Sequence, residues 1–143
     1  MCWCWTFDDG EVEAATLAIQ SAAGSCFGDR PYGLIGFSNG GYLLSKLLRA
    51  CALPAKLSRA RWMVSVGSAM FKGPLEPRPG SLAGCGQLTL LIGTRDQWNF
   101  DPADHFLQVL KAKGAAVDAV RFDGAHELPG PALQRVLEAR VAR

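Results

Sequence analysis

The chain has 143 residues, of which 49% are hydrophobic and 20% are charged, which fits one globular domain with a core of its own. Its net charge of +2 comes without a dense basic cluster, and this argues against nucleic-acid binding. No stretch approaches the ~20 consecutive apolar residues that a membrane-spanning helix needs.

The cysteines and the first residues bear on the cellular compartment. Five cysteines at irregular spacing form a poor disulfide framework, and no C-x-x-C pair is present for zinc or redox chemistry. The first residues lack the basic start, the long apolar centre and the cleavage site of a signal peptide. We therefore expect reduced thiols and a cytoplasmic protein.

The first half of the chain predicts two helices around one strand. Asp8 and Asp9 can cap a helix whose apolar stripe is Val12, Ala15, Ile19 and Ala22. Residues 24–31 are expected to form a loop, and residues 32–37 a strand. After Ser38, a second helix is indicated by apolar residues at helical spacing, namely Leu44, Leu47, Leu48 and Cys51.

The second half continues the alternation of strands and helices. Strands are predicted at residues 62–66, 88–92 and 117–122, and a surface loop rich in Pro and Gly at 71–86. Asp101 and Pro102 predict a helix start, and a last helix carries Leu133, Val136, Leu137 and Val141. The fold expected is a single three-layer α/β domain over residues 1–143, with about four mostly parallel strands and helices on both faces.

The predicted strand at residues 32–37 leads into Gly36-Phe37-Ser38-Asn39-Gly40, a match to the G-x-S-x-G pattern. In that pattern a strand enters a sharp turn and a helix leaves it, which places the serine at the apex. Glycines are expected on both flanks because a side chain there would collide with the neighbouring elements. The motif predicts that Ser38 is a nucleophile.

Two further polar residues lie at equivalent places in the chain. Asp96 and His126 follow later strands just as Ser38 follows the first, and open parallel sheets bind ligands along that edge. An imidazole can take the proton of a serine hydroxyl, and a carboxylate can orient the imidazole. The chain order Ser, Asp, His is that of the α/β-hydrolases.

Other acids and histidines of the chain are weaker candidates. Asp101 is better explained as a helix cap, and Asp123 precedes His126 too closely, so Asp96 is the favoured acid. His105 falls on the polar side of a predicted helix, where it is expected to be solvated.

Four segments carry a resemblance to a known family. They are Trp5 to Glu11, Gly36 to Gly41, Gly93 to Asp96 and Gly124 to Pro129. With them the chain resembles the carboxyl-terminal part of an α/β-hydrolase, closest to the small carboxylesterase/phospholipase-like serine hydrolases.

The resemblance implies an acyl-enzyme route on carboxylic esters, with Ser38 as nucleophile, His126 as base and Asp96 as acid. It implies no metal and no organic cofactor. The backbone N–H of Asn39 would supply one oxyanion donor, whereas the source of the second is not located. The candidates for an apolar acyl pocket are Met70, Phe71 and Trp98, for which plain packing over the sheet edge is nearly as good an explanation.

The sequence departs from the family at its front, because 37 residues precede Ser38 where the family has several strands and an oxyanion loop. The normally central strand at Tyr32 to Phe37 would then be an edge that needs covering. We expect a second copy of the chain to cover this edge in a homodimer. The alternatives are an arm made of Trp3, Trp5 and Phe7, or a missing segment of a longer gene product. The alternative function is a truncated hydrolase fold that no longer catalyses and serves as a binding or assembly module.

Overall fold

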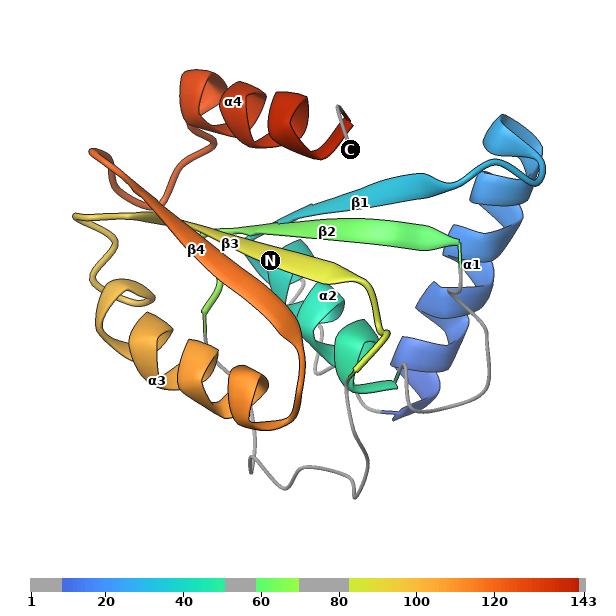
Figure 1. The fold of residues 1–143 in the computed structure, drawn as a ribbon, viewed down its shortest axis with the longest axis horizontal. Helices are drawn as coiled ribbons and strands as arrows, with labels where there is room; N and C mark the ends of the chain where they lie inside the picture. Colours follow the sequence, from blue (N-terminus) through green and yellow to red (C-terminus); the bar gives the residue numbers. More distant parts are fainter. Residues whose placement is uncertain (1–8, 51–58, 70–82, 142–143) are drawn as a thin grey trace, which may run out of the picture.

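The computed structural model describes residues 9–50, 59–69 and 83–141, and within them four strands form one sheet (Figure 1). The sheet order is β1-β2-β3-β4, and all three strand pairs are parallel. The strands are β1 (Tyr32–Phe37), β2 (Ala60–Val66), β3 (Gln87–Gly93) and β4 (Ala116–Phe122). The predicted parallel sheet is confirmed, and each predicted strand lies within an observed one.

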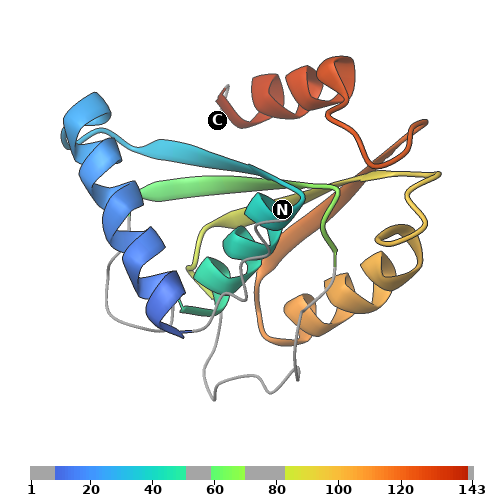
Figure 2. The same ribbon diagram turned by 180° about the vertical axis from the view of Figure 1, so that it is seen from behind.

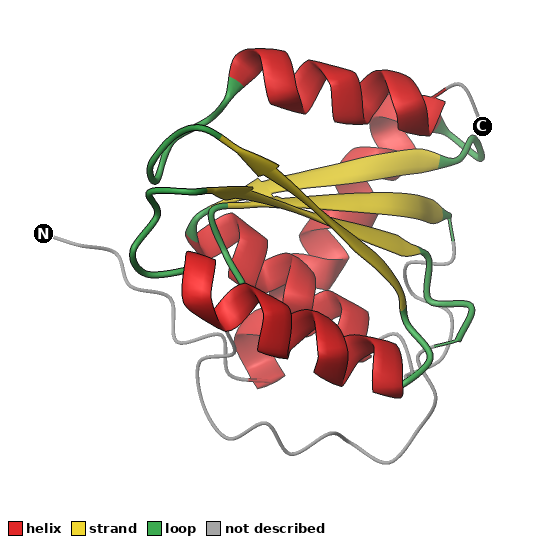
Figure 3. Ribbon diagram, turned by 60° about the vertical axis from the view of Figure 1, so that its left-hand side comes forward, coloured by secondary structure: helices red, strands yellow, loops and turns green. Residues whose placement is uncertain are grey.

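In the described part of the chain, four helices cover the two faces of this sheet. They are α1 (Asp9–Phe27), α2 (Asn39–Ala50), α3 (Phe100–Ala112) and α4 (Gly130–Val141). The views in Figures 2 and 3 show α1, α2 and α3 on one face and α4 alone on the other. The three-layer α/β architecture is therefore confirmed.

The core lies on both sides of the sheet. On the three-helix side, apolar residues of α2 and α3 pack against strand residues such as Leu88, Leu90 and Ile92, which are fully buried. On the α4 side, Val64, Val66 and Leu91 pack against Ala132 and Val136. Strands β2 and β3 are apolar on both faces, as expected for parallel strands that helices cover on both sides.

Two predicted helix boundaries are wrong. Helix α1 continues to Phe27 instead of ending before Gly24, and Ala23 rather than Ala22 is buried. Helix α3 has Asn99 as its N-cap residue, so Asp101 lies in the first turn and is not the cap. Asp101 is still favourably placed there, because the N-terminus of a helix attracts negative charge.

The cysteine prediction is also corrected in part. Cys26 is a free thiol, but Cys85 is disulfide-bonded, so the expectation that all thiols are reduced is wrong. The predicted aromatic arm at residues 3–7 lies outside the described residues. In the part of the chain that is described, no helix is long and apolar enough to cross a membrane.

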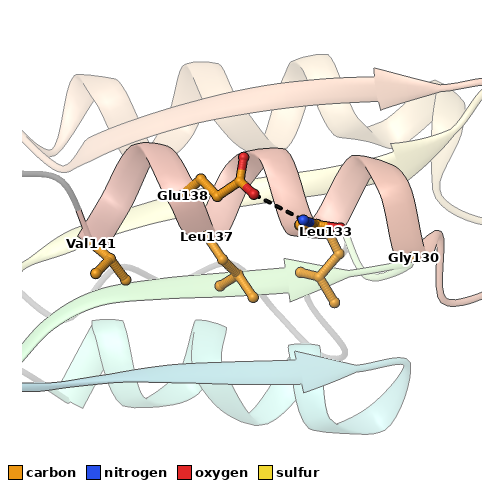
Figure 4. A pocket seen from close by; sticks show the side chains of 6 residues that line it. Gly130, Leu133, Leu137, Glu138 and Val141 are labelled. Atoms are coloured by element: carbon orange, nitrogen blue, oxygen red, sulfur yellow. Dashed lines mark hydrogen bonds between the residues drawn. The ribbon is translucent and has the colours of Figure 1, made fainter.

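Strand β1 lies at one edge of the sheet, as the sequence suggested. The side chains of Ile35 and Phe37 are 47% and 36% exposed there. Helix α4, which covers one face of the sheet, carries an open apolar groove. The groove is lined by Gly130, Leu133, Gln134, Leu137, Glu138 and Val141. Figure 4 shows Leu133, Leu137 and Val141 pointing away from the helix on its β1 side.

Candidate active site

The turn between β1 and α2 presents Ser38 in an unusual backbone conformation. Ser38 has φ of 54°, the single positive value for a non-glycine residue in the described segments. Such a conformation is disfavoured for a residue with a side chain, and it persists where the surroundings enforce it. Here the Ser38 N–H donates to the Val66 carbonyl at 2.9 Å, and the Ser38 carbonyl accepts from Gly41 and Tyr42. The neighbouring strand β2 and the helix α2 that follows therefore hold the serine at the apex.

The glycines around Ser38 differ in how much space a side chain would have at each position. A Cβ on Gly36 would lie less than 3.0 Å from the backbone of Gly40 and Gly41. A Cβ on Gly41 would lie 2.7 Å from the Cβ of Ser68, whereas one on Gly40 would meet no atom within 4 Å. The prediction that both motif glycines are sterically required is thus wrong for Gly40, and Gly41 takes that role.

The three predicted residues lie together at the carboxyl ends of β1, β3 and β4. His126 Nε2 lies 3.0 Å from Ser38 Oγ, and His126 Nδ1 lies 2.9 Å from Asp96 Oδ2. Because an ionised carboxylate only accepts hydrogen bonds, the proton of a neutral His126 belongs on Nδ1. Nε2 is then free to accept the Ser38 hydroxyl proton. This arrangement can generate a serine nucleophile.

Hydrogen bonds between two loops fix the distance between Asp96 and His126. The N–H groups of Thr94 and Arg95 donate to the carbonyls of Phe122 and Gly124 at 2.9 Å and 2.8 Å. Arg95 also forms an ion pair with Asp123. The two backbone hydrogen bonds join the loops after β3 and β4. The Arg95–Asp123 ion pair is exposed and adds little to this connection, and it keeps Asp123, the competing acid, outside the site.

Gly67, at the end of β2, lets His126 approach the sheet. It has φ of +59°, and a Cβ there would lie 2.9 Å from His126 Nδ1. On another side, the Phe37 ring packs against the imidazole with its centroid 5.1 Å away. Sequence reasoning gave neither contact, because both join residues that are far apart in the chain.

Solved structures similar to this fold include several hydrolases. A carboxylesterase from Mesorhizobium loti superposes with a TM-score of 0.72 at 22% identity, and the match covers 96% of this chain and 64% of that one. A carboxylesterase from Bacillus cereus gives 0.68 at 19% identity, with 96% and 65% covered. The mouse α/β hydrolase domain-containing protein 10 gives 0.53 at 14%, with 92% and 68% covered.

The chain has a shortened α/β-hydrolase fold. It spans slightly less than two thirds of the two carboxylesterases, and identities this low establish the fold and not a shared activity. No protein-family model matches the sequence, and no curated protein sequence matches it significantly.

In this α/β-hydrolase fold, the carboxylate of Asp96 is enclosed by neutral donors. Its Oδ1 accepts from the Trp98 N–H at 3.2 Å, and the Asn99 amide reaches Oδ1 and Oδ2 at 3.1 Å and 3.0 Å. Asp96 and Asn99 are each 1% exposed. Burial raises the pKa of the nearby Tyr42 phenol, and the charge of Asp96 raises it further. Tyr42 therefore stays neutral beside the carboxylate.

The other residues predicted for the site are not part of the hydrogen-bonded chain from Ser38 to Asp96. Asn39 is the first residue of α2, directly after Ser38, where a backbone N–H has no partner within the helix. Trp98 lies near Asp96 in the chain but is 76% exposed, and Met70 and Phe71 lie outside the described residues. His105 is exposed on α3, as predicted. No group of metal-binding side chains occurs in the described segments.

Proposed function

We propose that this protein is a serine hydrolase that cleaves carboxylic esters with small or medium acyl groups. The observation that carries the proposal is the continuous hydrogen-bonded chain from Ser38 Oγ through His126 to Asp96. The positive φ of Ser38 supports it further, because strained backbone conformations gather at functional sites.

In the proposed reaction, Ser38 Oγ attacks the ester carbonyl carbon while His126 Nε2 takes the hydroxyl proton. The tetrahedral intermediate collapses, the C–O bond to the alcohol breaks, and His126 returns the proton to the leaving alcohol. Water, deprotonated by His126, then attacks the acyl-enzyme and releases the acid and Ser38. Asp96 holds the imidazole in the required tautomer and stabilises its protonated form.

The negative oxygen of the intermediate needs hydrogen-bond donors. The backbone N–H of Asn39 is the proposed first donor, since it follows the nucleophile at the start of α2. Trp98, Met70 and Phe71 are the proposed contacts of the acyl group, and the exposed indole of Trp98 is available for this. The preference for esters draws on the fold shared with the carboxylesterases named above.

Active-site labelling with a fluorophosphonate tests this function. Wild-type protein should react in a one-to-one ratio at Ser38, Ser38→Ala should not react, and His126→Ala should react far more slowly because no base activates the hydroxyl. His105→Ala is the matched control and should react like wild type, because His105 is exposed on α3. Folded wild-type protein that fails to react would refute the hydrolase assignment.

The exposed edge of β1 favours association of the proposed hydrolase with a second copy of the chain. The strand has no charged residue or proline to discourage edge pairing. Leu34 packs against the core on the three-helix side, so the exposed Ile35 and Phe37, which alternate with it, face the α4 side. We propose that a second copy of the chain covers the β1 edge. A twofold axis would pair the two β1 strands antiparallel and bring both α4 grooves to one face of the joined sheet.

Analytical ultracentrifugation tests the homodimer. Wild-type protein should sediment as a dimer, and Ile35→Lys should dissociate it because a charge would enter the paired apolar surface. Val120→Lys is the control, since Val120 is 36% exposed on β4 at the opposite edge, and it should remain dimeric. A wild-type protein that stays monomeric at every concentration would contradict the proposal.

A further inference from the structure

The side chain of Asn99 makes three hydrogen bonds at the buried end of the Ser38–His126–Asp96 chain. Its Nδ2 donates to both oxygens of Asp96, and its Oδ1 accepts from the Ala69 N–H at 3.1 Å. The Ala69 N–H can only donate, so it requires the amide oxygen on its side. The amide nitrogen is consequently directed at the carboxylate.

The side chain of Asn99 does not cap helix α3, although the residue lies at the N-cap position. It occupies the N-cap position of α3, where asparagine is among the preferred residues because its side chain can accept from the first helical N–H groups. Here the side chain makes no capping hydrogen bond. The helix therefore lacks the stabilisation that a capping side chain provides, and the amide donates to Asp96 instead.

The Asp96 carboxylate has a particular need for such a donor. Its side chain is fully buried, and its ion-pair partner among the described residues is His126, which carries a charge only when protonated. A buried carboxylate without a fixed cation depends on hydrogen bonds from neutral groups. Asn99 contacts both oxygens, so it can fix the rotation of the carboxylate as well as stabilise its charge.

We propose that Asn99 is a positioning residue, which orients Asp96 so that Oδ2 faces His126 Nδ1. Through Ala69 it also ties the acid to the segment after β2, where Gly67 packs against the same imidazole. The expected effect of Asn99 on the labelling rate of Ser38 rests on the proposed serine hydrolase function. The orientation of Asp96 and His126 can be measured separately.

The test combines fluorophosphonate labelling with proton NMR of the His126 Nδ1–H. Asn99→Ala should lower the maximal labelling rate about 10- to 100-fold, the range found when outer hydrogen-bond partners of metal ligands are removed. The probe concentration at half-maximal rate should not change, because Asn99 lies beneath the carboxylate. The Nδ1–H resonance should shift, because the hydrogen bond to Asp96 changes.

Asn99→Ser is the second variant. It distinguishes loss of the amide from a general loss of folding. Serine is an equally good N-cap but lacks the amide, so it should preserve α3 and still slow labelling. Gln134→Ala is the control, because it removes an exposed amide-to-carboxylate hydrogen bond, to Glu138, on α4. It should change neither the rate nor the resonance.

The outcomes separate this inference from the proposed function. Normal labelling by the Asn99 variants, or slow labelling with an unmoved Nδ1–H resonance, would overturn the positioning role. If wild-type protein is not labelled but the resonance shifts in Asn99→Ser, the hydrolase function fails and the positioning role stands. A lower melting temperature with unchanged rate and resonance would make Asn99 a structural residue alone.

Discussion

Replacing Asp96 with asparagine should slow the acylation of Ser38 by about 10⁴-fold, by analogy with serine proteases in which the same change gives the wrong histidine tautomer. The substitution keeps the size of the side chain but replaces a carboxylate oxygen with an amide that can donate. An amide N–H facing His126 Nδ1 would move the imidazole proton to Nε2. Ser38 would then lose the acceptor that now lies 3.0 Å away.

Stopped-flow labelling and melting temperature measure this prediction together. The labelling rate should fall by the factor given above, whereas the melting temperature should change little, because the substituted side chain fits the same space. Asp123→Asn is the matched control: it alters the competing acid, which is exposed and paired with Arg95, and should leave labelling unchanged. Equal losses in the two variants would contradict the assignment of Asp96 as the acid.

Replacing Gly36 with alanine should destabilise the fold by about 3 kcal/mol or more, at or beyond the upper end of typical overpacking effects. The added methyl group would lie less than 3.0 Å from the backbone of Gly40 and Gly41. Backbone atoms cannot rotate away as a side chain can, so β1 and α2 would have to separate. Since domains have about 5–15 kcal/mol of stability in total, the variant should lose a large fraction of its stability, and its urea midpoint should fall. Urea denaturation measures the change.

Gly40→Ala provides a control four residues away in the same motif. A Cβ on Gly40 has open space around it, and Gly40 lies in the first turn of α2. Alanine is favoured over glycine in a helix by up to about 1 kcal/mol, so this variant should be unchanged or more stable. If both variants lose stability equally, the turn does not depend on the close approach at Gly36.

The elements and the site could be read from the sequence because their signals are local. Short apolar runs bounded by turn residues located the four strands, and Ser38, Asp96 and His126 were found because each lies just past the end of a strand. Errors arose where a local signal had competitors. Asp101-Pro102 is a strong helix start, but the chain enters α3 at Phe100, because Asn99 and Asp96 already organise the turn before it.

The sequence alone determined that this protein has a parallel α/β sheet and that a serine, an acid and a histidine lie at one edge of it. Only the tertiary structure decided what holds them there: Asn99 beneath Asp96, Gly67 against His126, and Gly41 beside Ser68. The physical reason is separation along the chain: Gly67 and His126 are 59 residues apart, and Gly41 and Ser68 are 27 apart. Asn99 is only three residues from Asp96, but the bond that fixes the direction of its amide comes from Ala69, 30 residues away. Such contacts depend on strand order and loop packing, which periodicity and turn chemistry do not encode.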